Sequence, residues 1–356
     1  MVYLKERFQR KRDCMKKNLF NKKTIIYLSL STIFVALFYF IIPKNTGAYT
    51  ITVWNSAFIY FIANIGTAIM LGSCGMVSFA SPAFMGLGAF TSVYICMHFD
   101  VNPFISMFLG MLMAMLMAAL IGMALMRLNG TFFTFSTVAL CQIAYTVYNG
   151  WKPVTGGPNG IPMVPSFSLF GWTAKQYVDN FYVLITIAII CGIIALRLQK
   201  TNFGRAMNSI RDNELVAKTN GVNVFKTKVI AFTIAAGFAG IAGACLAHST
   251  HYVVSTYFTY SNATMYIIQV MIGGVYNIIG VFAGTILITM LPEWLRPLQE
   301  YIKLVYGVGV ILLMIFMPMG VFGLGSNLIK RIKKRFNIKD KVTTIGVEEL
   351  EQEVYE

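Results

Sequence analysis

The sequence predicts an all-α, polytopic helical membrane protein with N and C termini cytoplasmic. We expect about 8 full spans plus a Gly-rich pair of half-length helices, about 8–10 transmembrane segments in total. Apolar residues make up 57% of the 356 residues and charged residues 12%, whereas a soluble domain carries about 25% charged residues. Several apolar runs exceed the roughly 18 residues that cross a bilayer as a helix. The runs are continuous rather than alternating, which disfavours a β-barrel.

Lysine and arginine are concentrated in three segments, and these set the predicted orientation. Of 29 basic residues, nine lie in 1–23, seven in 197–228 and seven in 330–341. Basic residues accumulate at the cytoplasmic ends of membrane spans. The net charge of +15 therefore indicates topology, and we expect no nucleic-acid partner.

Eight apolar runs are each predicted to span the membrane once, in alternating directions from a cytoplasmic N-terminus. They cover residues 24–42, 51–71, 76–96, 103–126, 131–149, 181–196, 229–249 and 303–320. This arrangement leaves an external loop at 150–180 and a cytoplasmic segment at 197–228. The predicted organisation is a basic cytoplasmic N-terminal segment (1–23), a transmembrane domain (24–325) and a cytoplasmic tail that is basic and then acidic (326–356).

Residues 263–291 do not fit this pattern, because the stretch is too long for one span and too short for two. With 303–320 as a single span and the tail inside, the stretch must begin and end outside. It is interrupted by four glycines, Gly273, Gly274, Gly280 and Gly284. We therefore expect two half-length helices that enter the membrane and return. Irregular backbone at that depth is tolerated only inside protein or beside water, which places this pair in the protein core near a pathway.

None of the 14 acidic residues falls within a predicted span. Carriers driven by an ion gradient usually hold an ionisable group within the bilayer, so a transporter with this sequence must be driven from elsewhere. The sequence also shows no Walker, nucleophile-elbow or zinc-protease motif. Its six cysteines and the pair His248 and His251 form no metal-ligand pattern. We expect no catalytic residue and no metal site on this chain.

Residues 204–228 form one long charged segment between two apolar runs. Residues 206–220 have helical character, and Gly221 is predicted to end the helix because glycine accepts the left-handed conformation. The less polar side of this helix carries Ala206, Met207, Ile210 and Ala217. Two interpretations are open. The segment is either an ordinary solvated loop or a docking element for a cytoplasmic motor.

The stretch DNELVAKTNG, residues 212–221, resembles the coupling loop of ATP-binding-cassette (ABC) importer permeases. Glu214, Ala217 and Gly221 stand in the E-x-x-A-x-x-x-G positions of that loop, whereas Leu215 and Val216 replace its two alanines. The resemblance implies a role in ATPase coupling for Gly204, Arg205, Ala206, Ile210, Arg211, Glu214, Ala217 and Gly221.

Further blocks over roughly residues 55–325 are similar, in family order, to the permease subunits of branched-chain amino-acid ABC importers. These blocks are GSCGMVSFASPAFMGLGAF (72–90), RLNGTFFTFSTVAL (127–140), TGGPNGI (155–161), VMIGGVYNIIGVFAGTILITMLPEWLR (270–296) and FMPMGVFG (316–323), the last with Met317 in place of the family's arginine. The resemblance implies a multi-pass permease subunit in the cell membrane, surrounded by lipid.

The resemblance also implies partners. They are a second homologous permease subunit, two cytoplasmic ATPase subunits that hold ATP and Mg²⁺, and an extracellular substrate-binding protein. No cofactor is expected on this chain. The implied cargo is a branched-chain or similar small amino acid. A permease of the same family for another small solute such as urea, or a gradient-driven carrier, is the alternative.

Three glycine-rich segments supply the remaining candidate residues. Candidates for a hinge or pathway wall are Gly72, Gly75, Ser78, Phe84, Gly86 and Gly88, together with the four glycines of 263–291, and close helix packing is the alternative. The external loop residues Thr155, Gly156, Gly157, Pro158, Asn159 and Gly160 would face the binding protein or cap the pathway, and a turn-rich connector is the alternative.

Cysteine labelling in intact cells tests the predicted orientation. Cysteines introduced at Lys175 and Gln299, on the external side, should react with an impermeant thiol reagent. A cysteine at Lys334, in the cytoplasmic tail, should not react, because basic segments stay inside. Labelling at Lys334 would contradict the orientation.

Overall fold

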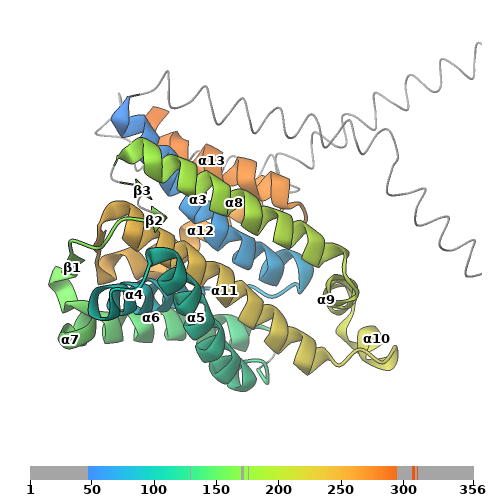
Figure 1. The fold of residues 1–356 in the computed structure, drawn as a ribbon. Helices are drawn as coiled ribbons and strands as arrows, with labels where there is room; N and C mark the ends of the chain where they lie inside the picture. The colour runs from blue at the N-terminus through green and yellow to red at the C-terminus, as the bar shows by residue number, and fades with distance from the viewer. Residues whose placement is uncertain are drawn as a thin grey trace, which may run out of the picture. The chain divides into compact units, whose positions relative to one another are not determined.

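The computed structural model describes residues 47–294, except for residues 129, 170, 171 and 175, and in addition residues 307, 308 and 311 (Figure 1). The predicted span at 24–42, most of that at 303–320 and both terminal segments lie outside the described residues. The chain divides into two units, residues 1–51 and 52–356. In the first unit, residues 48–51 begin a long helix, and the other described elements belong to the second.

Helices make up most of the described residues, as predicted. The long helices are α3 (Ala48–Ala68), α4 (Ser81–Phe99), α5 (Pro103–Leu125), α6 (Thr131–Gly150), α8 (Tyr177–Lys200), α11 (Val224–Thr250), α12 (Tyr260–Gly273) and α13 (Ile278–Trp294). The shorter elements are η1 (Ile69–Ser73), α7 (Lys152–Thr155), η2 (Gly157–Asn159), α9 (Asn202–Asp212), α10 (Glu214–Thr219) and η3 (Ser255–Phe258). Two antiparallel pairs join β1 (Ile161–Pro162) to β4 (Tyr252–Val253) and β2 (Ser168–Leu169) to β3 (Trp172–Thr173).

Five helices in the described part of the chain are long and apolar enough to cross a membrane, namely α3 with η1, α4, α5, α8 and α11. Each overlaps a predicted apolar run, although α8 and α11 begin four and five residues before the predicted runs and α4 begins after its own. Helix α4 begins at Ser81 rather than at residue 76, because Gly75 turns the chain with a φ of 70° and Pro82 suits a first helical turn. The chain is therefore an all-α polytopic membrane protein.

Helices α4, α5 and α11 pack so closely that their backbones are in contact. A Cβ added to Gly88 of α4 would overlap the backbone of Gly240 on α11. A Cβ added to Gly110 of α5 would lie 2.6 Å from the carbonyl oxygen of Gly88. Small residues allow such close contact between membrane helices. For Gly88, the structure therefore supports the close-packing interpretation.

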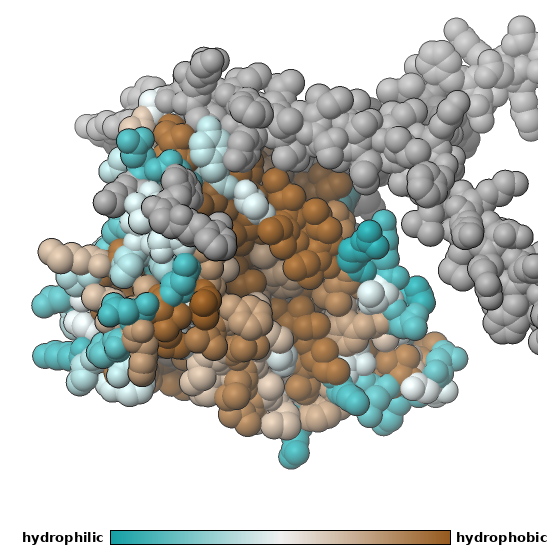
Figure 2. Space-filling view, in the orientation of Figure 1, coloured by the Kyte–Doolittle hydropathy of each residue, from teal (hydrophilic) through white to brown (hydrophobic). Residues whose placement is uncertain are grey.

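The outer side of this packed unit is apolar between two polar ends. Helix α5 turns small residues inward and exposes large ones such as Phe108 and Leu116, and α8 exposes Ile190, Ile193 and Ile194. Figure 2 shows apolar side chains across the middle of the face in view, with hydrophilic ones at the α9–α10 end and at the opposite end beside α7. A band of this kind matches the hydrocarbon layer of a bilayer.

The predicted Gly-rich pair is present as α12 and α13, which residues 274–277 separate. Gly274 turns the chain with a φ of 108°. The pair was predicted to lie in the protein core as two half-length helices. Gly273, Gly280 and Gly284 are buried where the two helices meet, whereas the turn between them is at the surface of the described residues. The carbonyl oxygen of Val275 lies against Gly72 at the end of η1, and Tyr276 is 71% exposed. The turn is at the surface because the two helices are longer than predicted. With 14 and 17 residues, they measure about 21 and 26 Å at 1.5 Å per residue.

Replacing Gly88 with valine should destabilise the fold, because the new side chain meets the backbone of Gly240. We expect a loss of about 2 kcal/mol in unfolding free energy, measured by denaturant titration of the purified protein in micelles. Gly150→Ala is the control, since no described atom lies within 4 Å of its added Cβ. Equal stability of the two variants would contradict the close packing.

Candidate functional site

The charged segment folds as two helices, α9 and α10, rather than as the single predicted helix over 206–220. The break falls at Asn213, which is extended with φ of −162° and ψ of 113°. Its side chain accepts hydrogen bonds from the backbone N–H groups of Leu215 and Val216, at 3.0 and 3.1 Å. Asparagine competes with the helix in this way and caps the next one. Gly221 follows α10 with a φ of 81°, as its predicted role required.

One side of the α9–α10 segment (Asn202–Thr219) is seated against the rest of the protein. Met207, Ile210 and Ala217 are buried, as is Gly204, which lies against the backbone at the end of α8. Of the four residues predicted on the less polar side, Met207, Ile210 and Ala217 are buried, whereas Ala206 is only half-buried, and Arg205 is exposed. The segment packs against α8, α11 and η1.

The other side of the same segment presents apolar residues to solvent. Leu215 is 75% exposed and Val216 53% exposed, at the beginning of α10. These two residues replace the alanines of the resembled coupling loop. A pair of adjacent exposed apolar residues in a charged segment is a candidate contact surface for another protein.

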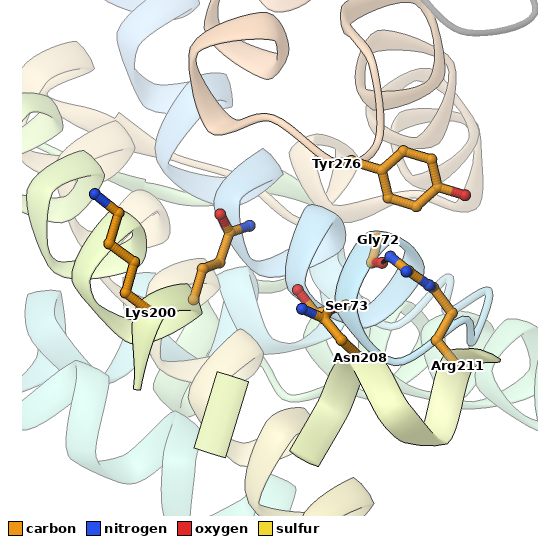
Figure 3. A pocket seen from close by; sticks show the side chains of 7 residues that line it. Gly72, Ser73, Lys200, Asn208, Arg211 and Tyr276 are labelled. Carbon is orange, nitrogen blue, oxygen red and sulfur yellow. Dashed lines mark hydrogen bonds between the residues drawn. The ribbon is translucent and has the colours of Figure 1, made fainter. Parts of the chain in front are cut away.

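Arg211 brings together residues that are far apart in the sequence. Its Nη1 donates a hydrogen bond of 2.9 Å to the carbonyl oxygen of Gly72. Its guanidinium carbon lies 4.7 Å from the centre of the Tyr276 ring. Its aliphatic stem lies on Gly75, where a Cβ would come within 2.9 Å of the arginine Cγ. Gly72, Gly75, Arg211 and Tyr276 thus form one junction between η1, α9 and the α12–α13 turn, called here the Arg211 junction (Figure 3).

A polar cavity of about 420 Å³ lies beside the Arg211 junction. Its lining residues are Gly72, Ser73, Gln199, Lys200, Asn208, Arg211 and Tyr276. Figure 3 shows Arg211 and Tyr276 facing each other at one end of it, with Lys200 at the other. The described residues thus leave open space between the end of α8, α9 and the α12–α13 turn.

Glu214 ties α10 to α11. Its Oε2 lies 2.7 Å from Nζ of Lys228, which is 7% exposed although Glu214 is exposed. A buried ammonium is costly unless it is paired. The carboxylate therefore has a structural task in addition to its position in the resembled coupling pattern. Neither Lys228 nor Tyr276 was singled out from the sequence, because nothing local marks a residue whose partner is distant.

The candidate external loop lies at the other end of α11 from the Arg211 junction. Gly156, Gly157 and Gly160 all have positive φ, between 64° and 72°. The hydroxyl of Thr155 donates to the carbonyl oxygen of Trp151 at 2.8 Å, and that of Tyr252 donates to the carbonyl oxygen of Asn159 at 2.8 Å. Pro158 lies within η2. The loop is thus bonded to Trp151, which follows α6, and to Tyr252 of β4, which follows α11.

The other candidate hinge residues are packed inside the helical unit. Phe84 meets Phe232 edge to face with ring centres 5.3 Å apart, and Gly86 lies against the ring of Tyr148. Ser78 accepts a hydrogen bond of 3.3 Å from the N–H of Ala80. Gly273, Gly280 and Gly284 lie where α12 and α13 touch. Of the ten candidates, Gly72 and Gly75 meet the α9–α10 segment.

A buried polar cluster joins α3 to the α12–α13 pair. The Asn64 amide donates to Oε1 of Gln269 at 2.7 Å and to the hydroxyl of Thr285 at 2.8 Å. All three residues are buried, and amides in membranes usually bond between helices in this way. His248 is likewise bonded, to Ser92 and to the carbonyl oxygen of Pro165, both at 2.8 Å. In the described part of the chain, no group of three or more His, Cys, Asp or Glu residues is placed to hold a metal.

The long apolar helices, with the charged α9–α10 segment between α8 and α11, define a multi-pass helical membrane protein. A model of the family described as branched-chain amino acid transport system / permease component matches residues 49–338, and the chain belongs to this family. It is a multi-pass protein of the cell membrane.

Curated relatives carry the same description. The high-affinity branched-chain amino acid transport system permease protein LivM of Escherichia coli strain K12 is 26% identical over 302 residues, 78% of this chain and 71% of the relative. LivM of Salmonella typhimurium is 25% identical over 323 residues, 84% and 75% of the two chains. The probable permease LivH of Methanocaldococcus jannaschii is 22% identical over 292 residues, 75% and 90%. No solved structure matches the chain.

The cap at Asn213 yields a test of the two-helix segment. Asn213→Ala should speed hydrogen exchange at the amides of Leu215 and Val216, because their acceptor is removed. The expected acceleration is about fivefold, for a cap worth about 1 kcal/mol. Asn213→Asp keeps an acceptor and should exchange like the parent. Unchanged exchange in Asn213→Ala would contradict the cap.

Proposed function

We propose that this chain is the permease subunit of an ATP-driven importer and forms the translocation pathway for branched-chain or similar small amino acids. A binding protein outside the cell delivers the solute, and two cytoplasmic ATPase subunits drive its passage. The observation that carries the proposal is the α9–α10 segment, seated by Met207, Ile210 and Ala217 and exposing Leu215 and Val216. The printed names of the LivM relatives support the substrate class.

Leu215 and Val216 are the residues with which the segment docks to an ATPase subunit. They lie at the beginning of α10, held by the Asn213 cap, so their positions are fixed before a partner arrives. Contacts of this preordered kind lose little conformational entropy on binding. Burial of a leucine side chain contributes about 2 kcal/mol, which is enough to make Leu215 a principal contact.

The segment is attached in a way that passes movement to two spans at once. Thr201 is both the last cap of α8 and the first cap of α9, so α9 follows α8 without a flexible linker. On the other side, the ion pair between Glu214 and Lys228 joins α10 to α11. A rigid displacement of the segment therefore displaces the ends of α8 and α11.

We assign ATP and Mg²⁺ to the ATPase subunits, since this sequence has no phosphate-binding loop. The chain itself acts as a transport subunit and not as an enzyme. The exposed apolar side chains of α5 and α8 face lipid or the second homologous permease subunit. The loop from Thr155 to Gly160 faces the binding protein, on the side where β1 pairs with β4.

Docking is tested with Leu215→Asp. In the assembled complex, this variant should reduce co-purification of the ATPase subunit about tenfold or more, because a carboxylate replaces a buried apolar contact. Uptake of labelled leucine should fall with it, while the permease remains folded, since Leu215 is exposed.

The matched control is Met163→Asp, which makes the same kind of change at a residue that is 87% exposed beside the external loop. This variant should retain the ATPase subunit. Normal co-purification and uptake in Leu215→Asp would make the segment a solvated connector and contradict the proposed function.

A further inference from the structure

We propose that Arg211 is a positioning residue that carries the movement of α9 to the α12–α13 turn and so to the inside of the membrane domain. This inference rests on the proposed function, because it supplies the route from the docked segment to the helices. Arg211 would act through its contacts with Gly72 and Tyr276, without touching the transported solute.

The first step of the route is the contact with Tyr276. The α9 helix is seated on α8, α11 and η1, while the α12–α13 turn lies across the polar cavity of about 420 Å³. At one end of this cavity, Arg211 meets the turn, with its guanidinium 4.7 Å from the Tyr276 ring centre. An arginine over an aromatic face is attracted by the ring quadrupole, so the turn is held to α9 at this point.

The second step is the hydrogen bond to Gly72. A charged N–H donor to a carbonyl oxygen is stronger than a neutral one, and this bond measures 2.9 Å. Gly72 in turn lies against the carbonyl oxygen of Val275, so η1 and the turn share a contact surface. Movement of Arg211 therefore acts on the turn both directly and through η1.

Two further contacts orient the Arg211 side chain. Its stem lies on Gly75, whose φ of 70° and missing Cβ keep that position open. At the end of the side chain, Nη2 of Arg211 lies 2.8 Å from Oδ1 of Asp212 and forms an ion pair with it. Asp212 thereby orients the planar fork, since two of its nitrogens bond the same carboxylate oxygen. A lysine could keep the charge but not this fork.

From the turn, the route continues into the membrane interior. Helices α12 and α13 both begin or end at the turn and are joined to α3 by the cluster of Asn64, Gln269 and Thr285. Spatial adjacency alone does not establish coupling. Arg211 and Tyr276 are therefore expected to be energetically coupled, so that their effects on transport are not independent.

The experiment uses the complete transporter, with both permeases and both ATPases, reconstituted in vesicles with its binding protein. Leucine uptake and ATP hydrolysis are measured side by side for Arg211→Ala, Tyr276→Leu and the double variant. Each single variant should lose about fivefold or more of the leucine moved per ATP hydrolysed, the size of a typical coupling free energy. The double variant should lose no more than the larger single loss.

Controls separate this role from a general loss of structure. Arg197→Ala removes an exposed arginine from the last turn of the neighbouring helix α8, outside the candidate coupling residues, and should couple normally. Tyr276→Phe keeps the ring and should also couple normally. Tyr276 is exposed, so its variants leave the fold intact even if Arg211→Ala does not.

The outcomes also distinguish this inference from the proposed function. Normal leucine transport per ATP in Tyr276→Leu, or single losses that multiply in the double variant, would overturn the Arg211 route. If Leu215→Asp abolishes ATPase binding in the same assay, the proposed function stands although the route fails. If Leu215→Asp changes nothing, the docking itself is refuted.

Discussion

The contact between α4, α5 and α11 is the constraint on which the other features depend. Gly88, Gly110 and Gly240 bring three backbones together where any side chain would separate them. In a bilayer, lipid tails are as apolar as leucine, so helices associate through close packing rather than through burial from water. This unit fixes the position of α11, and α11 carries Lys228 at one end and the β4 segment at the other.

Once α11 is fixed, the charged segment has only limited freedom. Thr201 joins it directly to α8, and the Glu214–Lys228 pair anchors it to α11. Lys228 is buried at the edge of the apolar layer, where an unpaired ammonium would be costly. Glu214 therefore serves the fold as well as any docking partner. Replacement of this residue confounds the two roles, and for that reason the exposed Leu215 isolates docking more cleanly.

The sequence predicted much of the fold because hydrophobic length is a strong signal in membrane helices. It located the runs that became α5, α8 and α11, and the break at Gly274. It failed where a single side chain decided the local structure. The Asn213 cap divides α9 from α10. Helical periodicity does not predict this break, because the apolar pattern continues through residue 217. Gly75 and Pro82 likewise delay the start of α4, although the apolar run begins earlier.

The candidate site was predictable in part for the same reason. Gly72, Gly75 and Arg211 were each marked by resemblance to a family pattern. The proximity of Arg211 to the two glycines was not predictable, because Arg211 is 139 residues from Gly72 in the sequence and meets it only in the fold. The sequence around Tyr276 does not indicate its role, because that role depends on the contact between its ring and Arg211. Tertiary partners of this kind become visible only when the helices are placed.

The interior of the helical unit is held by neutral polar groups, whereas the α9–α10 end uses charges. Asn64 donates to both Gln269 and Thr285, with no formal charge to desolvate, and neutral amide bonds of this kind join helices within a bilayer. At the Arg211 junction, a cavity and exposed partners keep the local dielectric high, and charged contacts there are individually weak. A weak contact can break and re-form within one transport cycle, and a desolvated amide cluster cannot do so as readily. The division therefore places exchangeable contacts at the α9–α10 end of the chain and lasting ones in the interior of the helical unit.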